Sequence, residues 1–90
     1  MELIHFLGVI FSIKSFLNAA YINLGVAYDK EDSVAAAEVC YNEAKEYYLK
    51  NENESKVISI LINQGIIQRG KGDFMNSKLL FDAAKKRLEG

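Results

Sequence analysis

The chain repeats a short phrase at an interval of forty residues. The letters INLG at residues 22–25 return as INQG at residues 62–65. Sliding the sequence against itself by forty positions gives six identities, which are Ser15 with Ser55, Ile22 with Ile62, Asn23 with Asn63, Gly25 with Gly65, Ala44 with Ala84 and Lys45 with Lys85. A period of 20–50 residues is typical of solenoids, in which each repeat is one supersecondary unit stacked on the next. Residues 1–10 fall over 41–50, so the repeat count is about two and a half.

Apolar and small residues recur at helical spacing in both halves of each unit. In the first unit the two stripes are Leu17, Tyr21, Leu24, Gly25 and Tyr28, then Val34, Ala37, Tyr41, Ala44 and Tyr48. The chain has no proline, so nothing interrupts long helices. We therefore predict one all-α domain over 1–90, built from antiparallel helical hairpins stacked as a short right-handed solenoid. It divides into a partial apolar repeat at 1–13 and full repeats at 14–50 and 51–90.

Capping residues predict where these helices begin. Asn51 and Glu54 have the spacing of a capping box, and Asp32 or Ser33 can cap the helix that follows them. Gly70 and Gly72 break the chain before Asp73, which can cap the last helix. The expected turn at residues 10–13 has no turn-forming residue but Ser12, so residues 2–29 form either one helix or two.

A glycine inside a helix costs about 1 kcal/mol relative to alanine, so the two repeated glycines need a compensating contact. We predict that Gly25 and Gly65 lie on the buried face of each hairpin. There an aromatic ring can lie against the bare backbone, and Tyr41 and Phe81 stand sixteen residues further along the chain in both units.

The residues of the first unit resemble the tetratricopeptide repeat. The matching positions are Tyr21, Leu24, Gly25, Tyr28, Ala37, Tyr41 and Ala44. The second unit matches at Leu61, Gly65, Ser77, Phe81 and Ala84, but Gln64 and Gln68 replace the leucine and the aromatic residue. The forty-residue length is similar to the repeats of kinesin light chains and of bacterial peptide-pheromone receptors and response-regulator phosphatases.

This resemblance implies a non-catalytic module that binds a peptide or protein segment, with bacterial regulation as the expected setting. The first helices of the repeats would line a concave groove, and an asparagine side chain there can bond a peptide backbone through both its donor and its acceptor. The expected groove residues are Asn23, Val26, Lys30, Lys56, Asn63, Ile66 and Arg69.

The sequence offers little for catalysis or for other partners. His5 is the only histidine, and Cys40 is the only cysteine, expected as a buried, inert thiol in a reducing, cytoplasmic setting. A net charge of −1 gives no reason to expect nucleic acid, and four of the five tyrosines fall on packing stripes, leaving Tyr47 as the exposed one. We predict no enzyme activity, no cofactor and no metal. The N-terminal apolar run is short of the roughly 20 residues that span a bilayer, so no membrane span is expected.

The N-terminal segment suggests a second mode of action. It is apolar with hardly a polar side, and an exposed surface of that kind is normally an association site. The expected oligomer interface comprises Leu3, Ile4, Phe6, Leu7, Ile10 and Phe11. The chain would then be a structural homo-oligomer, with a dimer favoured, or part of a longer array or larger regulator.

Overall fold

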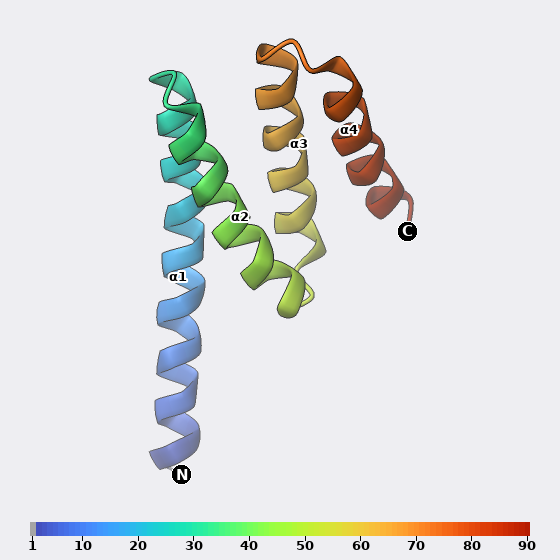
Figure 1. Cartoon of the computed structure of the whole chain (residues 1–90). Helices are drawn as coiled ribbons and strands as arrows, with labels where there is room; N and C mark the ends of the chain where they lie inside the picture. The colour runs from blue at the N-terminus through green and yellow to red at the C-terminus, as the bar shows by residue number, and fades with distance from the viewer. Residues whose placement is uncertain (1) are drawn as a thin grey trace.

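The computed structural model describes residues 2–90, which form four α-helices (Figure 1). They are α1 at Glu2–Lys30, α2 at Val34–Lys50, α3 at Glu54–Gly70 and α4 at Phe74–Glu89. The all-α prediction is confirmed. Of the two possibilities for the N-terminal region, the single long helix is the one that forms.

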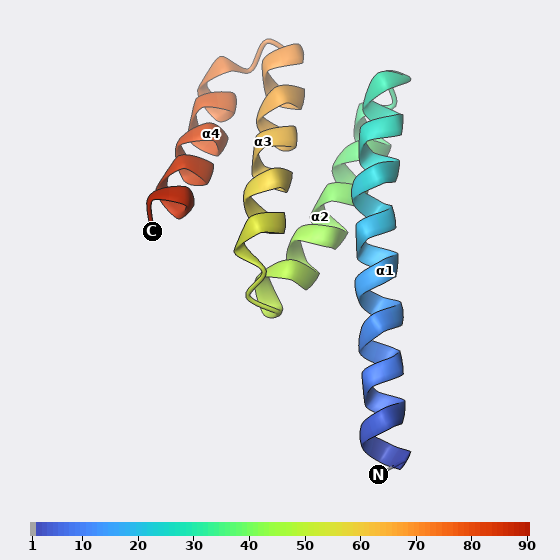
Figure 2. The same cartoon turned by 180° about the vertical axis from the view of Figure 1, so that it is seen from behind.

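The helices pair along the chain as antiparallel hairpins. α1 packs against α2, α3 packs against α4, and α2 joins the two hairpins by packing against α3. α1 also touches α3, and Figure 2 shows these two helices standing nearly upright with α2 slanting between them. The molecule measures 53 × 33 × 13 Å, and its longest dimension comes from the N-terminal half of α1, which runs on beyond the end of α2 (Figure 1).

The predicted role of the repeated glycines is confirmed. A Cβ atom built on Gly25 would lie 2.6 Å from the Tyr41 ring, and one built on Gly65 would lie 2.6 Å from the Phe81 ring. Real Cβ atoms do not approach a ring carbon so closely, so only glycine lets each pair of helices meet here. The loss of helix propensity is offset by a tighter contact between the two helices of each hairpin.

Alanine at Gly25 is expected to destabilise the fold by about 1–2 kcal/mol, because overpacking outweighs the gain in helix propensity. Gly65→Ala should cost less, because Phe81 is only half-buried and can move, whereas Tyr41 is fully buried. Gly8→Ala is the matched control, since nothing lies within 4 Å of a Cβ at that helical glycine. Urea unfolding of the three variants measures these differences, and a Gly25→Ala variant as stable as Gly8→Ala would contradict the packing role.

The three connections between helices share one geometry. The middle residue of each, Asp32, Glu52 or Gly72, has a positive φ, at 61°, 55° and 82°. In each, the backbone N–H of the next residue bonds back to the helix just ended, as Asn53 does to Tyr48 O at 3.0 Å. These hydrogen bonds satisfy carbonyl groups at the helix end that have no partner within the helix, as in a Schellman motif. The capping-box prediction for Asn51 is wrong, because that residue follows α2 and its side chain bonds to Tyr47 O.

The residue after each positive-φ position opens the next helix. Asn53 and Asp73 accept hydrogen bonds from the backbone N–H groups of Lys56 and Asn76, both at 3.2 Å. Ser33 occupies the same place before α2 but makes no capping bond through its side chain. The cap predicted at Asp73 is confirmed, and the cap of α3 lies two residues later than the sequence spacing indicated.

Glycine at position 52 is expected to stabilise the protein by about 0.5–1 kcal/mol, because glutamate is strained in the left-handed region that glycine adopts freely. Gly72→Ala tests the same effect in the opposite direction and should destabilise by a similar amount. Thermal unfolding followed by circular dichroism compares both with the parent. A lower melting temperature for Glu52→Gly would show that the side chain makes a compensating contact.

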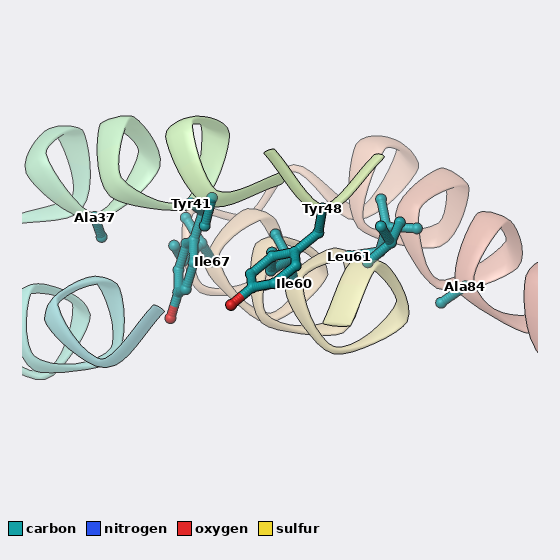
Figure 3. Packing of buried hydrophobic residues seen from close by; sticks show 9 residues of the cluster. Ala37, Tyr41, Tyr48, Ile60, Leu61, Ile67 and Ala84 are labelled. Atoms are coloured by element: carbon teal, nitrogen blue, oxygen red, sulfur yellow. The ribbon is translucent and has the colours of Figure 1, made fainter. Parts of the chain in front are cut away.

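The core lies along α2, where its side chains meet those of α3 (Figure 3). Tyr41 and Tyr48 project into it from α2, and Ile60, Leu61 and Ile67 meet them from α3. Burial raises the pKa of the Tyr41 hydroxyl, and Asp29 and Cys40 add to the shift. The core therefore depends on one helix that contacts both of its neighbours.

Candidate interaction surfaces

Asn23 and Asn63 occupy equivalent places on α1 and α3. Each lies two residues before a packed glycine. Two residues correspond to about 200° around the helix axis, so the asparagine side chain lies on the opposite side of the helix from the glycine. Asn23 is exposed and Asn63 is half-buried. Among residues 2–90 neither side-chain amide has a hydrogen-bond partner, so both remain able to bond another molecule.

The other residues expected in the groove differ in their surroundings. Val26 is half-buried and packs against the core, so only part of its side chain is exposed on this surface. Ile66 is exposed, as is Ile62 one turn earlier on the same helix. The three cations expected there, Lys30, Lys56 and Arg69, are exposed, and within the described part of the chain none of them forms an ion pair.

The N-terminal half of α1 presents large apolar side chains to solvent on most sides. The exposed ones include Leu3, Ile4, Phe6, Leu7, Val9, Phe11, Ile13, Phe16 and Leu17, and each is between 43% and 80% exposed. Ile10, also expected in an oligomer interface, is half-buried. A helix that is apolar on most sides is normally covered by protein or by lipid.

α1 is long and apolar enough to cross a membrane. Its most apolar window of 18 residues has a mean hydropathy of 1.6, and 6% of that window is buried. The unbroken apolar run is shorter than this helix, which also contains scattered polar residues. Length and composition alone do not distinguish a membrane span from a helix that packs against protein.

A cleft of about 580 Å³ separates the N-terminal half of α1 from the end of α2. Its walls combine apolar and charged side chains, and they include Leu7, Ile10, Phe11, Lys14, Leu17, Glu43, Glu46, Tyr47 and Lys50. The prediction that Tyr47 is exposed is wrong. Tyr47 is half-buried and packs edge-to-face against Tyr48, and its hydroxyl oxygen is buried with no hydrogen-bond partner among residues 2–90.

Tyr47→Phe is expected to leave the fold unchanged and to stabilise it by up to about 1 kcal/mol, because it removes a buried hydroxyl without a hydrogen bond. Tyr48→Phe is the comparison, since the Tyr48 hydroxyl donates to Ser15 O at 3.4 Å. That variant should be neutral or slightly destabilised. Urea unfolding of both measures the difference, and a clear loss of stability in Tyr47→Phe would reveal a hydrogen bond to its hydroxyl.

Gln64 shows how the second unit departs from the repeat pattern without losing its packing. It stands where the first unit has Leu24, yet its side chain is buried at the contact between α2 and α3. Its carbonyl accepts a hydrogen bond from Lys45 Nζ and its amide donates to Asn42 Oδ1, both at 3.0 Å. Burial lowers the pKa of Lys45. The pattern marked Gln64 as a mismatch, whereas the structure makes it a polar link between the repeats.

The side chains considered for chemistry lie apart from one another. Cys40 is buried in α2, and His5 is exposed near the start of α1. Among residues 2–90, no three His, Cys, Asp or Glu side chains gather as a metal site would require.

We found no family model, no curated protein and no solved structure that matches this chain. The likeness to tetratricopeptide repeats therefore rests on the residues quoted above.

Proposed function

We propose that this chain is a non-catalytic, cytoplasmic protein-interaction module of the long tetratricopeptide type. Its hairpins would stack as a right-handed solenoid of about two and a half repeats, and the face made by α1 and α3 would bind an extended peptide or protein segment. Regulation by peptides in a bacterial cell is the setting that the resemblance favours. Two equivalent hairpins, each closed by a glycine under an aromatic ring, support this proposal.

The observation that carries the proposal is the pair of free amides at Asn23 and Asn63. Their positions repeat along the chain as the hairpins do, and an extended peptide also presents its backbone groups at regular intervals. Each amide can donate one bond and accept another, so the pair can hold a peptide backbone whatever its side chains are. Ile62 and Ile66 add apolar contacts beside them.

The charges of this face suggest the kind of segment it would bind. Lys30, Lys56 and Arg69 have no carboxylate partner within the described residues and stand on the helices that carry the two asparagines. Exposed cations contribute little to stability but can orient an incoming anion. A peptide with acidic side chains or a free carboxyl end therefore fits best.

Replacing both asparagines with alanine should weaken peptide binding about tenfold or more, because two to four hydrogen bonds are lost. The probe is a display library of random seven-residue peptides with free carboxyl ends, and the affinity of enriched peptides is measured by fluorescence anisotropy. Asn76→Ala on α4 is the matched control and should bind as the parent does. Enrichment that is equal on the parent and on the double variant would overturn the proposal.

Self-association is a second candidate function, favoured by the exposed apolar side chains of α1. In that case the chain is a structural element of a helical homo-oligomer. The peptide-binding face and the apolar half of α1 involve different residues, so the two functions can be tested separately.

A further inference from the structure

The same face is buried in α3 and uncovered in α1. Val57 and Gln64 of α3 are 1% and 8% exposed, because α2 packs against that side. Their equivalents forty residues earlier, Leu17 and Leu24, are 49% and 45% exposed. The repeat thus shows that this side of α1 is shaped to receive a helix, as α3 receives α2.

The uncovered face continues through the N-terminal half of α1. Phe6, Val9 and Ile13 precede Leu17 and Leu24 at intervals of three, four, four and seven residues, which keeps all five on one side of the helix. We name these five residues the α1 strip. It spans 18 residue steps, or about 27 Å at 1.5 Å per residue. Spacings of this kind are those of helices that pack side by side at a shallow angle.

The α1 strip exposes enough apolar area for a small interface. At roughly 200 Å² for a fully exposed large side chain, its five residues expose on the order of 500 Å² per copy. Two strips that face each other therefore bury on the order of 1,000 Å² in total, which is the lower end of the range for a specific interface.

The far end of the fold does not offer a matching surface for head-to-tail stacking. On α2, Asn42 and Lys45 bond Gln64 of α3, whereas their equivalents on α4 are Asp82 and Lys85. Both are exposed, and Asp82 pairs with Lys78 along α4. Charged side chains on that face suit water better than they suit an apolar helix. Among residues 2–90, the apolar half of a second α1 is the surface that matches an apolar α1.

A protein partner suits this surface better than lipid does. Lys14 interrupts the apolar residues of α1 between Ile13 and Phe16, and a lysine near the centre of a bilayer costs about 2.5–3.5 kcal/mol. In the cleft beside α2, Lys14 shares its surroundings with Glu43 and Glu46. Carboxylates in that position favour an aqueous protein interface.

We propose that two copies of the chain associate through their α1 strips as an antiparallel, two-fold symmetric pair, with Ile13 near the axis. This register places Val9 opposite Leu17 of the second copy and Phe6 opposite its Ala20, and it leaves Leu24 at the edge of the contact, opposite Glu2. An aromatic side chain then faces a small residue, as Tyr41 and Phe81 face glycines within each hairpin. A two-fold contact of one surface with itself closes as a dimer and does not extend into fibres.

Sedimentation equilibrium at micromolar concentrations should give twice the monomer mass of 10.1 kDa. Ile13→Glu should give a monomer with unchanged helix content, because Ile13 makes no core contact and is 60% exposed. Leu79→Glu on α4 is the matched control at 61% exposed, and it should remain dimeric. A monomeric parent, or an Ile13→Glu variant that dimerises as Leu79→Glu does, overturns the proposal.

Cysteine cross-linking tests the antiparallel arrangement. Ile13→Cys should form an intermolecular disulfide readily, because the two cysteines meet at the axis, and native Cys40 is buried. Phe6→Cys should not, since 14 residue steps separate the two copies of position 6 by about 21 Å. Equal cross-linking of both variants would indicate a parallel pair and refute the arrangement.

Two further measurements distinguish dimerisation from peptide binding and from membrane binding. The Asn23→Ala, Asn63→Ala double variant should keep the dimer mass, so loss of peptide binding and loss of the dimer are distinguishable. The parent is also mixed with phosphatidylcholine vesicles and floated on a density gradient. Recovery of the dimer in the vesicle-free fraction supports the proposal, and recovery of monomer with the vesicles overturns it.

Discussion

The fold depends on the contact between an aromatic ring and the bare backbone of a glycine. In each hairpin this contact fixes how closely and at which height the two helices meet, because the ring has one place where no Cβ is in its way. The pairing of Gly25 with Tyr41 and of Gly65 with Phe81 makes the hairpins alike. α2 also packs against α3, and that contact buries the core residues of Figure 3.

The contacts that could be predicted from the sequence are those that occur in both repeats. Helical spacing and the forty-residue echo indicated the all-α class, the buried glycines and the rings that cover them. The start of α3 could not be read in this way, because the αL conformation of Glu52 shifts the cap from Asn51 to Asn53, and glutamate is not a residue that signals a positive φ. Length was also ambiguous for α1, since nothing at residues 10–13 either requires or forbids a turn.

The candidate surfaces were predictable to a different degree. The sequence placed Asn23 and Asn63 away from the packed face because helical geometry alone decides that. It could not tell that Val26 packs against the core, or that the Tyr47 hydroxyl is buried, because both depend on how a neighbouring helix crosses. Gln64 is the clearest case, since a polar residue at an apolar position becomes comprehensible only when Lys45 and Asn42 are seen beside it.

The outer helices α1 and α4 differ in a way that follows from these contacts. Where one repeat meets the next, α2 uses a lysine and an asparagine to satisfy Gln64, and the corresponding lysine and aspartate on α4 remain in water. Leu24 of α1 corresponds to Gln64, but it offers no hydrogen bond to any polar side chain that approached it. A helix with the polar face of α4 would therefore leave its charges unpaired against α1, at a desolvation cost. An apolar surface avoids that cost, and within residues 2–90 the N-terminal half of α1 is the helical segment that presents one.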